Sequence, residues 1–295
     1  LVFSDFDHIE KKKTSYINPN LFLISVPKYK KNISMRRVLS HKLFSKKLGA
    51  ILNQQKPDII YALIPPNSIC KQVCKYKKKH KECRVIFDVY DLWPESFPLN
   101  NTKIFLSFWK KIRDDNLKIA DLILTECNYY KNYLQKFNLG KKIETVYLGK
   151  VPLREKINYN YRDEIINLCY LGSINHIIDL EIMVNLLDVI NKKKKICLYI
   201  IGDGEKRELL LKKLSQKDVK YTFCGKLYDE KKINYIFSLC QYGINIYSSN
   251  TSIGLTMKSI DYFRAGLPII TMNIKDTDEL VKNINVVFQL MKKIF

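Results

Sequence analysis

Glycine and proline are scarce in this chain of 295 residues, with 10 and 9 copies, which excludes collagen-like and low-complexity sequence. No apolar run approaches the roughly 20 residues that span a bilayer as a helix. The eight cysteines form no C-x-x-C pair and mostly stand inside apolar runs, so we expect buried, reduced thiols. Neither a G-x-S-x-G nor a P-loop pattern is present, which removes support for acyl transfer and ATP hydrolysis.

Acidic residues are few relative to basic ones, 29 against 51, which gives a formal net charge of +22. Residues 1–150 hold 29 Lys/Arg and 13 Asp/Glu, net +16, whereas residues 151–295 hold 22 and 16, net +6. The first half is therefore expected to carry most of the attraction for an anionic partner. A polyanion groove is one interpretation, since 19 tyrosines accompany the charge, but no RRM, KH or helix-turn-helix signature supports nucleic-acid binding.

Short apolar runs alternate with longer amphipathic stretches along the whole chain, which is typical of parallel sheets covered by helices. We expect a first series of strands at 21–26, 58–63, 84–88, 121–125 and 143–147. A second series is expected at 166–171, 196–201, 219–224, 242–247 and 267–271. The predicted fold class is α/β, with two doubly wound Rossmann-like domains that face each other across a cleft. The irregular segment 148–165 separates them into residues 1–150 and 151–295.

Carboxylates cluster after the strand predicted at 84–88, in the segment DVYDLWPESFP. Asp88, Asp91 and Glu95 are candidate catalytic residues, because they can accept protons or hydrogen-bond sugar hydroxyls. Trp93 offers an apolar face for a sugar ring. The alternative is a capped loop with a packed tryptophan, and the pattern leaves both open.

A second cluster lies in residues 245–270, where a polar loop is followed by a helix that we expect to open at Gly254. The unpaired N–H groups of its first turn would suit a diphosphate. Lys258 and Asp261 lie three residues apart, so both can face one crevice, the first toward phosphate and the second toward ribose hydroxyls. The alternative is an ordinary helix–strand unit.

Other signals are weaker. Gly202 and Gly204 would let the backbone approach a ligand closely, although G-D-G after a strand also makes a plain tight turn. Gly172 and Ser173 end the first strand of the second series. The D-x-D at 5–7 is expected to cap a loop, and the cysteine spacings match no usual zinc pattern, so we expect no metal and no cofactor.

The chain resembles bacterial GT-B glycosyltransferases of the large retaining group called family 4, in particular enzymes of capsule, O-antigen and exopolysaccharide biosynthesis. It is also similar to members that transfer galactofuranose. The segments that carry the resemblance run through most of the chain: DVYDLWPESFP (88–98), ADLILTE (120–126), YLGS (170–173), IGDGE (201–205), FCGKL (223–227) and GLTMKSIDYFRAGLPII (254–270).

This resemblance implies an acceptor-binding first domain and a second domain that binds a nucleotide-sugar, commonly UDP-linked. The donor-binding residues that it implies are Gly172, Ser173, Gly202, Gly204, Gly225, Lys226, Gly254, Leu255, Thr256, Lys258 and Asp261. The backbone of 254–256 would hold the diphosphate, Asp261 the ribose, and Gly225 with Lys226 the base. The implied reaction transfers the sugar to an acceptor on a polyprenyl diphosphate lipid.

Three departures from the family pattern affect the donor site. The Arg and Lys that often follow the Y-L-G strand are absent from the run Gly172–His176, and Lys258 would substitute for them. The Glu that usually starts the last motif is also absent, and Tyr90 stands where many relatives have His. Relatives further open with a strand and a glycine-rich loop before the equivalent of SDFDH, so we expect the first domain to lack that unit and the chain to be incomplete.

Because the implied acceptor is carried on a polyprenyl diphosphate lipid, the resemblance predicts a cytoplasmic protein that is associated peripherally with the inner face of the plasma membrane. The basic and apolar residues near the helix predicted at 34–55 suit an anionic leaflet: Tyr29, Lys30, Lys31, Arg36, Arg37 and Phe44. The alternative is a general lysine bias. Three alternative functions stay open: a basic nucleic-acid-binding protein, a sugar-nucleotide epimerase of the same architecture, and a truncated, inactive relative.

Overall fold

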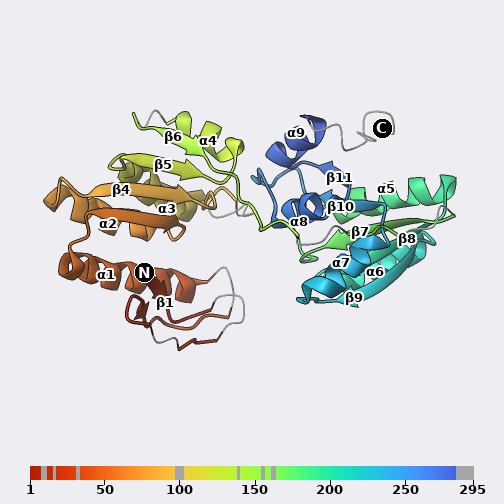
Figure 1. Ribbon diagram of the computed structural model, residues 1–295, viewed down its shortest axis with the longest axis horizontal. Helices are drawn as coiled ribbons and strands as arrows, with labels where there is room; N and C mark the ends of the chain where they lie inside the picture. The colour runs from red at the N-terminus through yellow and green to blue at the C-terminus, as the bar shows by residue number, and fades with distance from the viewer. Residues whose placement is uncertain are drawn as a thin grey trace. The chain divides into compact units, whose positions relative to one another are not determined.

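A computed structural model describes residues 1–7, 12–15, 18–30, 34–96, 103–137, 140–153, 157–160 and 164–283 (Figure 1). The chain divides into two compact units, Leu1–Val146 and Tyr147–Phe295. The division falls at the end of the last strand predicted for the first series, four residues before the boundary predicted after residue 150.

The first unit contains two parallel sheets rather than one. Its elements in chain order are β1 (Val2–Ser4), β2 (Phe22–Ile24), α1 (Met35–Gln55), β3 (Ile59–Ile64), α2 (Ser68–Lys79), β4 (Arg84–Val89), α3 (Lys103–Leu117), β5 (Leu122–Thr125), α4 (Asn128–Gln135) and β6 (Ile143–Thr145). Strands β3, β4, β5 and β6 pair in that order, while β2 pairs with β1 in a separate sheet. All five strands expected for this unit are therefore present, but β2 pairs with the short strand β1, which was not expected, and not with the other four.

One face of the four-stranded sheet is buried and the other is open among the described residues. Along β3, Ile60, Ala62 and Ile64 are buried, whereas Ile59 and Leu63 are exposed. The strand order is sequential, so right-handed crossovers bring α2, α3 and α4 to the same face of the sheet. The alternating exposure of β3 follows from this one-sided covering.

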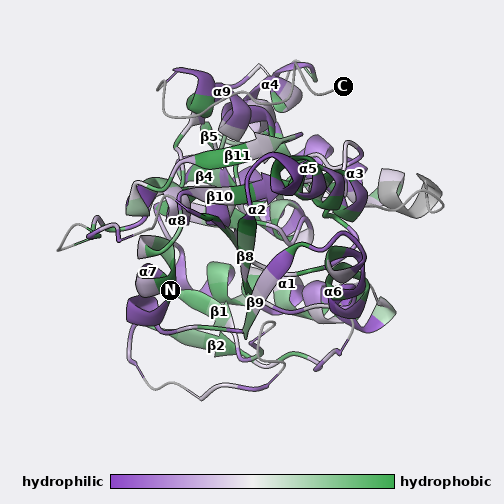
Figure 2. Ribbon diagram, turned by 90° about the vertical axis from the view of Figure 1, so that its right-hand side faces the viewer, coloured by the Kyte–Doolittle hydropathy of each residue, from purple (hydrophilic) through white to green (hydrophobic). Residues whose placement is uncertain are grey.

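The second unit is a five-stranded parallel sheet with helices on both faces. Its elements are β7 (Ile166–Leu171), α5 (Leu180–Lys193), β8 (Ile196–Ile201), α6 (Arg207–Gln216), β9 (Lys220–Gly225), α7 (Glu230–Ser238), β10 (Tyr242–Ile246), α8 (Met257–Ala265), β11 (Ile269–Met272) and α9 (Lys275–Asn283). Strand β8 is coloured hydrophobic along its length and α6 mainly hydrophilic (Figure 2), as expected for a buried strand under an exposed helix.

Two apolar layers stabilise this sheet. On one face, α5 and α6 pack against β7 and β8 through residues such as Met183, Leu198 and Leu210. On the other face, Phe237 of α7 and Tyr262 of α8 pack in a second cluster. The predicted doubly wound arrangement is therefore confirmed for the second unit.

The strand order of this sheet is β11-β10-β7-β8-β9, so the chain reverses direction between β7 and β10. In open parallel sheets, ligands bind outside the carboxyl ends of the strands at such a reversal. The described helices include none long and apolar enough to cross a membrane.

Close packing of β10 against α8 gives a testable prediction. A Cβ added to Gly243 would lie 2.8 Å from three ring atoms of Tyr262, which is fully buried. We expect Gly243→Ala to lower the free energy of unfolding by about 1–3 kcal/mol through overpacking. Denaturant titration followed by circular dichroism would measure this loss. Gly149→Ala, where nothing lies within 4 Å of the added Cβ, is the control, and equal stability of both variants would contradict this packing.

Candidate functional site

The carboxyl ends of β7 and β10 hold a lysine between two tyrosine rings. Lys258, in the first turn of α8, places its Nζ 4.4 Å from the ring centroid of Tyr170 and 4.8 Å from that of Tyr247. Its side chain is buried, and Nζ has no hydrogen-bond partner among the described residues. Burial lowers the pKa of Lys258 to about 7. Among the described residues, the protonated form of Lys258 is therefore stabilised by aromatic faces and by no hydrogen-bond acceptor.

Gly172 and Gly202 allow two loops at this edge to touch through their backbones. A Cβ on Gly202 would lie 1.9 Å from the carbonyl oxygen of Gly172, and one on Gly204 would lie 2.3 Å from that of Ile174. The amide of Ile174 also donates to the Asp203 carbonyl at 3.0 Å. The prediction that Gly202 and Gly204 let the backbone approach a ligand is corrected here: what approaches them is the loop after β7.

The remaining glycine-loop residues lie around these contacts. Ser173 is exposed, and its carbonyl accepts a hydrogen bond from the Tyr170 hydroxyl at 2.8 Å. His176 Nδ1 lies 2.8 Å from Glu205 Oε1, which ties the two loops together. Gly225 ends β9 with a φ of +66° and accepts the Gly202 amide through its carbonyl at 2.7 Å, while Lys226 beside it is exposed.

Helix α8 begins at Met257, three residues later than predicted. The reason is Thr256, which is the N-cap and accepts the Ser259 amide at 3.1 Å through its hydroxyl. Asn245 at the end of β10 donates to Thr256 Oγ1 at 3.0 Å and to Ser259 Oγ at 2.7 Å. Gly254 and Leu255 therefore precede the helix instead of opening it, and their loop is fixed to β10 by buried hydrogen bonds.

Asp261 lies one turn beyond Lys258 on α8, and it is paired with a different lysine. Its carboxylate forms an ion pair with Lys150, which belongs to the segment that opens the second unit. Lys150 also lines an apolar cavity of about 840 Å³, together with Leu255, Ile260 and Phe263. The prediction that Asp261 and Lys258 face one crevice stays a prediction, and a ribose that bound at Asp261 would compete with Lys150.

The three predicted catalytic carboxylates of the first unit have three different sets of partners. Asp88 accepts the Tyr61 hydroxyl at 2.5 Å, and this hydrogen bond raises the pKa of Tyr61 to about 12. Asp91 accepts Trp93 Nε1 at 2.6 Å, and burial raises the pKa of Asp91. The Trp93 ring stacks on His41 and is covered by Arg37, with 8% of the residue exposed. The packed-tryptophan alternative is therefore the correct one.

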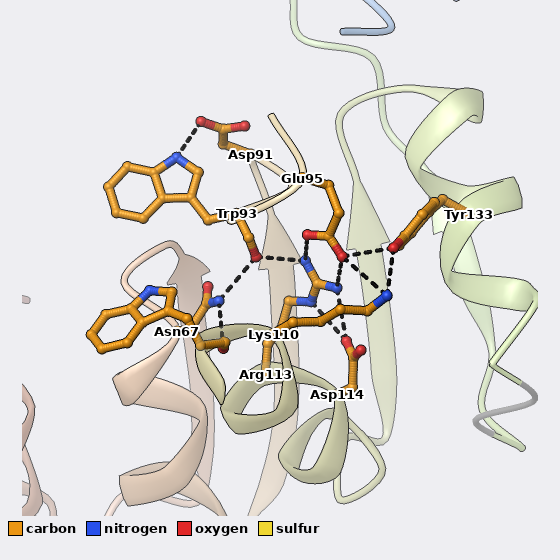
Figure 3. A network of polar contacts seen from close by, with 9 residues as sticks. Asn67, Asp91, Trp93, Glu95, Lys110, Arg113, Asp114 and Tyr133 are labelled. Atoms are coloured by element: carbon orange, nitrogen blue, oxygen red, sulfur yellow. Dashed lines mark hydrogen bonds and ion pairs between the residues drawn. The ribbon is translucent and has the colours of Figure 1, made fainter. Parts of the chain in front are cut away.

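Glu95 forms a bidentate ion pair with Arg113, which is fully buried (Figure 3). The two hydrogen bonds measure 2.8 and 2.9 Å, and Tyr133 donates a third to Glu95 at 2.7 Å. Burial raises the pKa of Glu95, but the bonds and charge of Arg113 outweigh this and the net pKa is lowered. A carboxylate held in this way stabilises the loop around Trp93, which corrects the expectation that Glu95 is an available proton acceptor.

Among the described residues, no group of three or more histidine, cysteine, aspartate or glutamate side chains could hold a metal ion. Asp5 of the D-x-D motif accepts Lys13 Nζ at 2.6 Å and the Val26 amide at 3.0 Å, as expected for a residue that caps a loop. All eight cysteines are free, and six are buried, in agreement with the prediction.

Residues 166–289 match the family described as Glycosyl transferases group 1. Curated relatives include the chitobiosyldiphosphodolichol beta-mannosyltransferases of Kluyveromyces lactis, 30% identical over 102 residues, and of Candida glabrata, 30% identical over 90 residues. These matches cover 31% and 30% of this chain but only 21% and 20% of the relatives, so the chain spans about a fifth of their length.

Solved structures show the same architecture. The lipopolysaccharide outer core galactosyltransferase WaaB has a TM-score of 0.61 and 15% identity, covering 90% of this chain and 75% of its own. Anabaena Alr3699/HepE, in complex with UDP and glucose, has a TM-score of 0.54 and 11% identity, covering 90% and 76%. At these identities the likeness shows the fold alone. Most of the second unit thus matches the glycosyl transferases group 1 model, and the chain has the GT-B fold.

Several residues of the site were not predicted: Tyr170, Tyr247, Lys150 and Arg113. The tyrosines stand in or directly after strands that were predicted correctly, so their position at the carboxyl edge was a usable signal. Lys150 and Arg113 carry no local signal, because their partners lie 111 and 18 residues away in sequence.

The ion pairs of Arg113 predict that a single substitution at Glu95 lowers the stability of the first unit strongly. Glu95→Gln removes the anion that compensates a fully buried guanidinium, so we expect the first unit to lose about 3 kcal/mol of stability. Both tryptophans of the chain lie in this unit, so their fluorescence during denaturant titration reports on it.

Glu144→Gln is the matched control, since it removes an exposed pair with Lys131 in the same unit. We expect that variant to unfold at nearly the wild-type midpoint. A Glu95→Gln variant that behaves like it would contradict a structural role for the Glu95–Arg113 pair.

Proposed function

We propose that this protein is a glycosyltransferase whose second unit binds a nucleotide-sugar donor, UDP-linked, at the carboxyl ends of β7 and β10. The observation that carries the proposal is Lys258, a buried amino group with no hydrogen-bond partner among the described residues, at the sheet reversal within the part of the chain that matches Glycosyl transferases group 1. A buried charge is costly unless something compensates it, and an anionic ligand would do so.

The residues at this edge suit a diphosphate. The first turn of α8 presents backbone N–H groups without intrahelical partners, and Lys258 stands in the same turn. As the bond from the sugar to the diphosphate breaks, the leaving group gains negative charge. Groups placed for that developing charge stabilise the transition state more than the ground state. Lys258 and the amides of α8 would supply this stabilisation from the protein itself.

For the acceptor we propose a sugar carried on a polyprenyl diphosphate, as in the assembly of cell-surface polysaccharides. The names of the curated relatives support a lipid diphosphate acceptor, since they act on chitobiosyldiphosphodolichol. The same names favour mannose as a candidate for the transferred sugar. UDP in the HepE structure supports a uridine donor instead, so both classes of donor belong in the test.

Donor binding is the direct test. Calorimetry on the full chain should show uptake of UDP- or GDP-linked sugars, and Asp261→Asn should weaken it about 10- to 100-fold if the carboxylate holds the ribose. Glu279→Gln, an exposed acid on α9, is the control and should bind as the wild type does. The proposal fails if no UDP- or GDP-species binds, and the ribose assignment fails if Asp261→Asn binds normally.

We further propose that the first unit contacts an anionic membrane surface through α1. Met35 and Leu39 are 74% and 46% exposed on this helix, and Arg36, Lys42 and Lys46 are exposed beside them. Such a mixture of apolar and basic side chains suits an anionic leaflet. Two residues predicted for this surface are corrected. Tyr29 is buried, and Arg37 packs over Trp93, while Lys31 lies outside the described residues.

Vesicle sedimentation tests this surface. We expect Lys42→Gln with Lys46→Gln to weaken binding to phosphatidylglycerol vesicles roughly 30-fold, because each cation contributes about 1 kcal/mol at an anionic surface. Lys193→Gln with Lys194→Gln removes the same charge from exposed positions of the second unit and is the control. Equal losses in both pairs, or equal binding to phosphatidylcholine vesicles, would contradict an α1 docking surface.

A further inference from the structure

The space beside Gly172 is bounded by the end of the Lys258 side chain. A Cβ on Gly172 would lie 3.3 Å from Lys258 Cε and 3.5 Å from Nζ, with no other described atom within 4 Å. Gly172 has a φ of +127°, which other residues rarely adopt, so the chain keeps this position without a side chain. A ligand oxygen placed beside Gly172 would lie near Nζ, and it could accept a charge-assisted hydrogen bond from the protonated amine.

The groups that face Lys258 supply no negative charge. Tyr170 and Cys169 come from β7 and Tyr247 follows β10, and burial raises the pKa of all three, so each is neutral near pH 7. On α8 itself, Asp261 is engaged by Lys150. Among the described residues that face Nζ, no anion stabilises its protonated form. The pKa of Lys258 is therefore set by the burial of its side chain and lies at about 7.

We propose that Gly172 and Lys258 form a phosphate subsite in which the anion binds together with one proton that Nζ takes up from solvent. This inference rests on the proposed donor site and goes beyond it, because it states how the site changes its charge. An anion beside Nζ favours the ammonium form, so the bound state holds the proton to higher pH than the free state. Nucleoside diphosphate affinity should therefore fall as the pH rises above about 7.

Calorimetry with UDP at about pH 8.5 tests this, because the ligand phosphates are fully ionised there and do not themselves exchange protons. Repeating the titration in two buffers of different ionisation enthalpy counts the protons transferred. We expect close to one proton taken up for each UDP bound. Inorganic pyrophosphate should compete with UDP, since the subsite contacts only phosphate; it still carries a proton of its own at this pH, so the protons are counted with UDP alone.

Three variants make the test specific. Lys258→Met should bind UDP at least about tenfold more weakly at neutral pH and take up no proton, with an unfolding midpoint no lower than the wild type. Lys258→Arg keeps a permanent charge, so its affinity should not change with pH in this range. Lys232→Met, an exposed lysine of α7, should retain both wild-type affinity and proton uptake.

The outcomes separate this inference from the proposed function. UDP binding by the wild type without proton uptake would overturn the inference and leave the donor site standing. Proton uptake that persists in Lys258→Met would overturn it as well, since another group would then be titrating. Absence of any UDP, GDP or pyrophosphate binding would overturn both the inference and the proposed function.

Discussion

A lysine amino group enclosed by protein, with no hydrogen-bond partner among the described residues, is the constraint on which the second unit's site depends. Lys258 is held between Tyr170 and Tyr247, whose rings compensate only part of its desolvation. A fold retains such a group at lower stability than an apolar side chain would give. The location explains why it is retained: the sheet reverses there, and ligands of open parallel sheets bind at that edge.

The surrounding structure keeps this lysine in place through contacts that small residues permit. The loops after β7 and β8 touch at Gly172 and Gly202, so that neither can shift without the other. Below α8, Asn245 bonds to Thr256 and Ser259, which fixes where the helix begins and therefore where Lys258 points. The first unit shows the opposite solution for a buried cation: Arg113 is fully compensated by Glu95 and Asp114. Among the described residues, Arg113 thus has carboxylate partners, whereas Lys258 has none.

Strands and helices were predictable because their apolar periods are strong, and β7 and β8 match the predicted bounds. The pairing of β2 with β1 was missed, since a strand of three residues carries too little pattern. Lys258 was predicted as a phosphate contact, yet its burial depends on Tyr170, which lies 88 positions earlier in the sequence. For Gly202 and Gly204, the sequence indicates only that another group approaches their backbone closely. Which group approaches is decided by tertiary packing.

The pKa of Lys258, measured by NMR on isotope-labelled lysine and assigned with Lys258→Arg, tests the central claim most directly. The account predicts a value of about 7 in the ligand-free protein and a rise of at least about two and a half pH units when UDP saturates the site. A ligand-free value near the ordinary lysine pKa of about 10.4 would contradict it, because the ammonium would then already have a compensating partner.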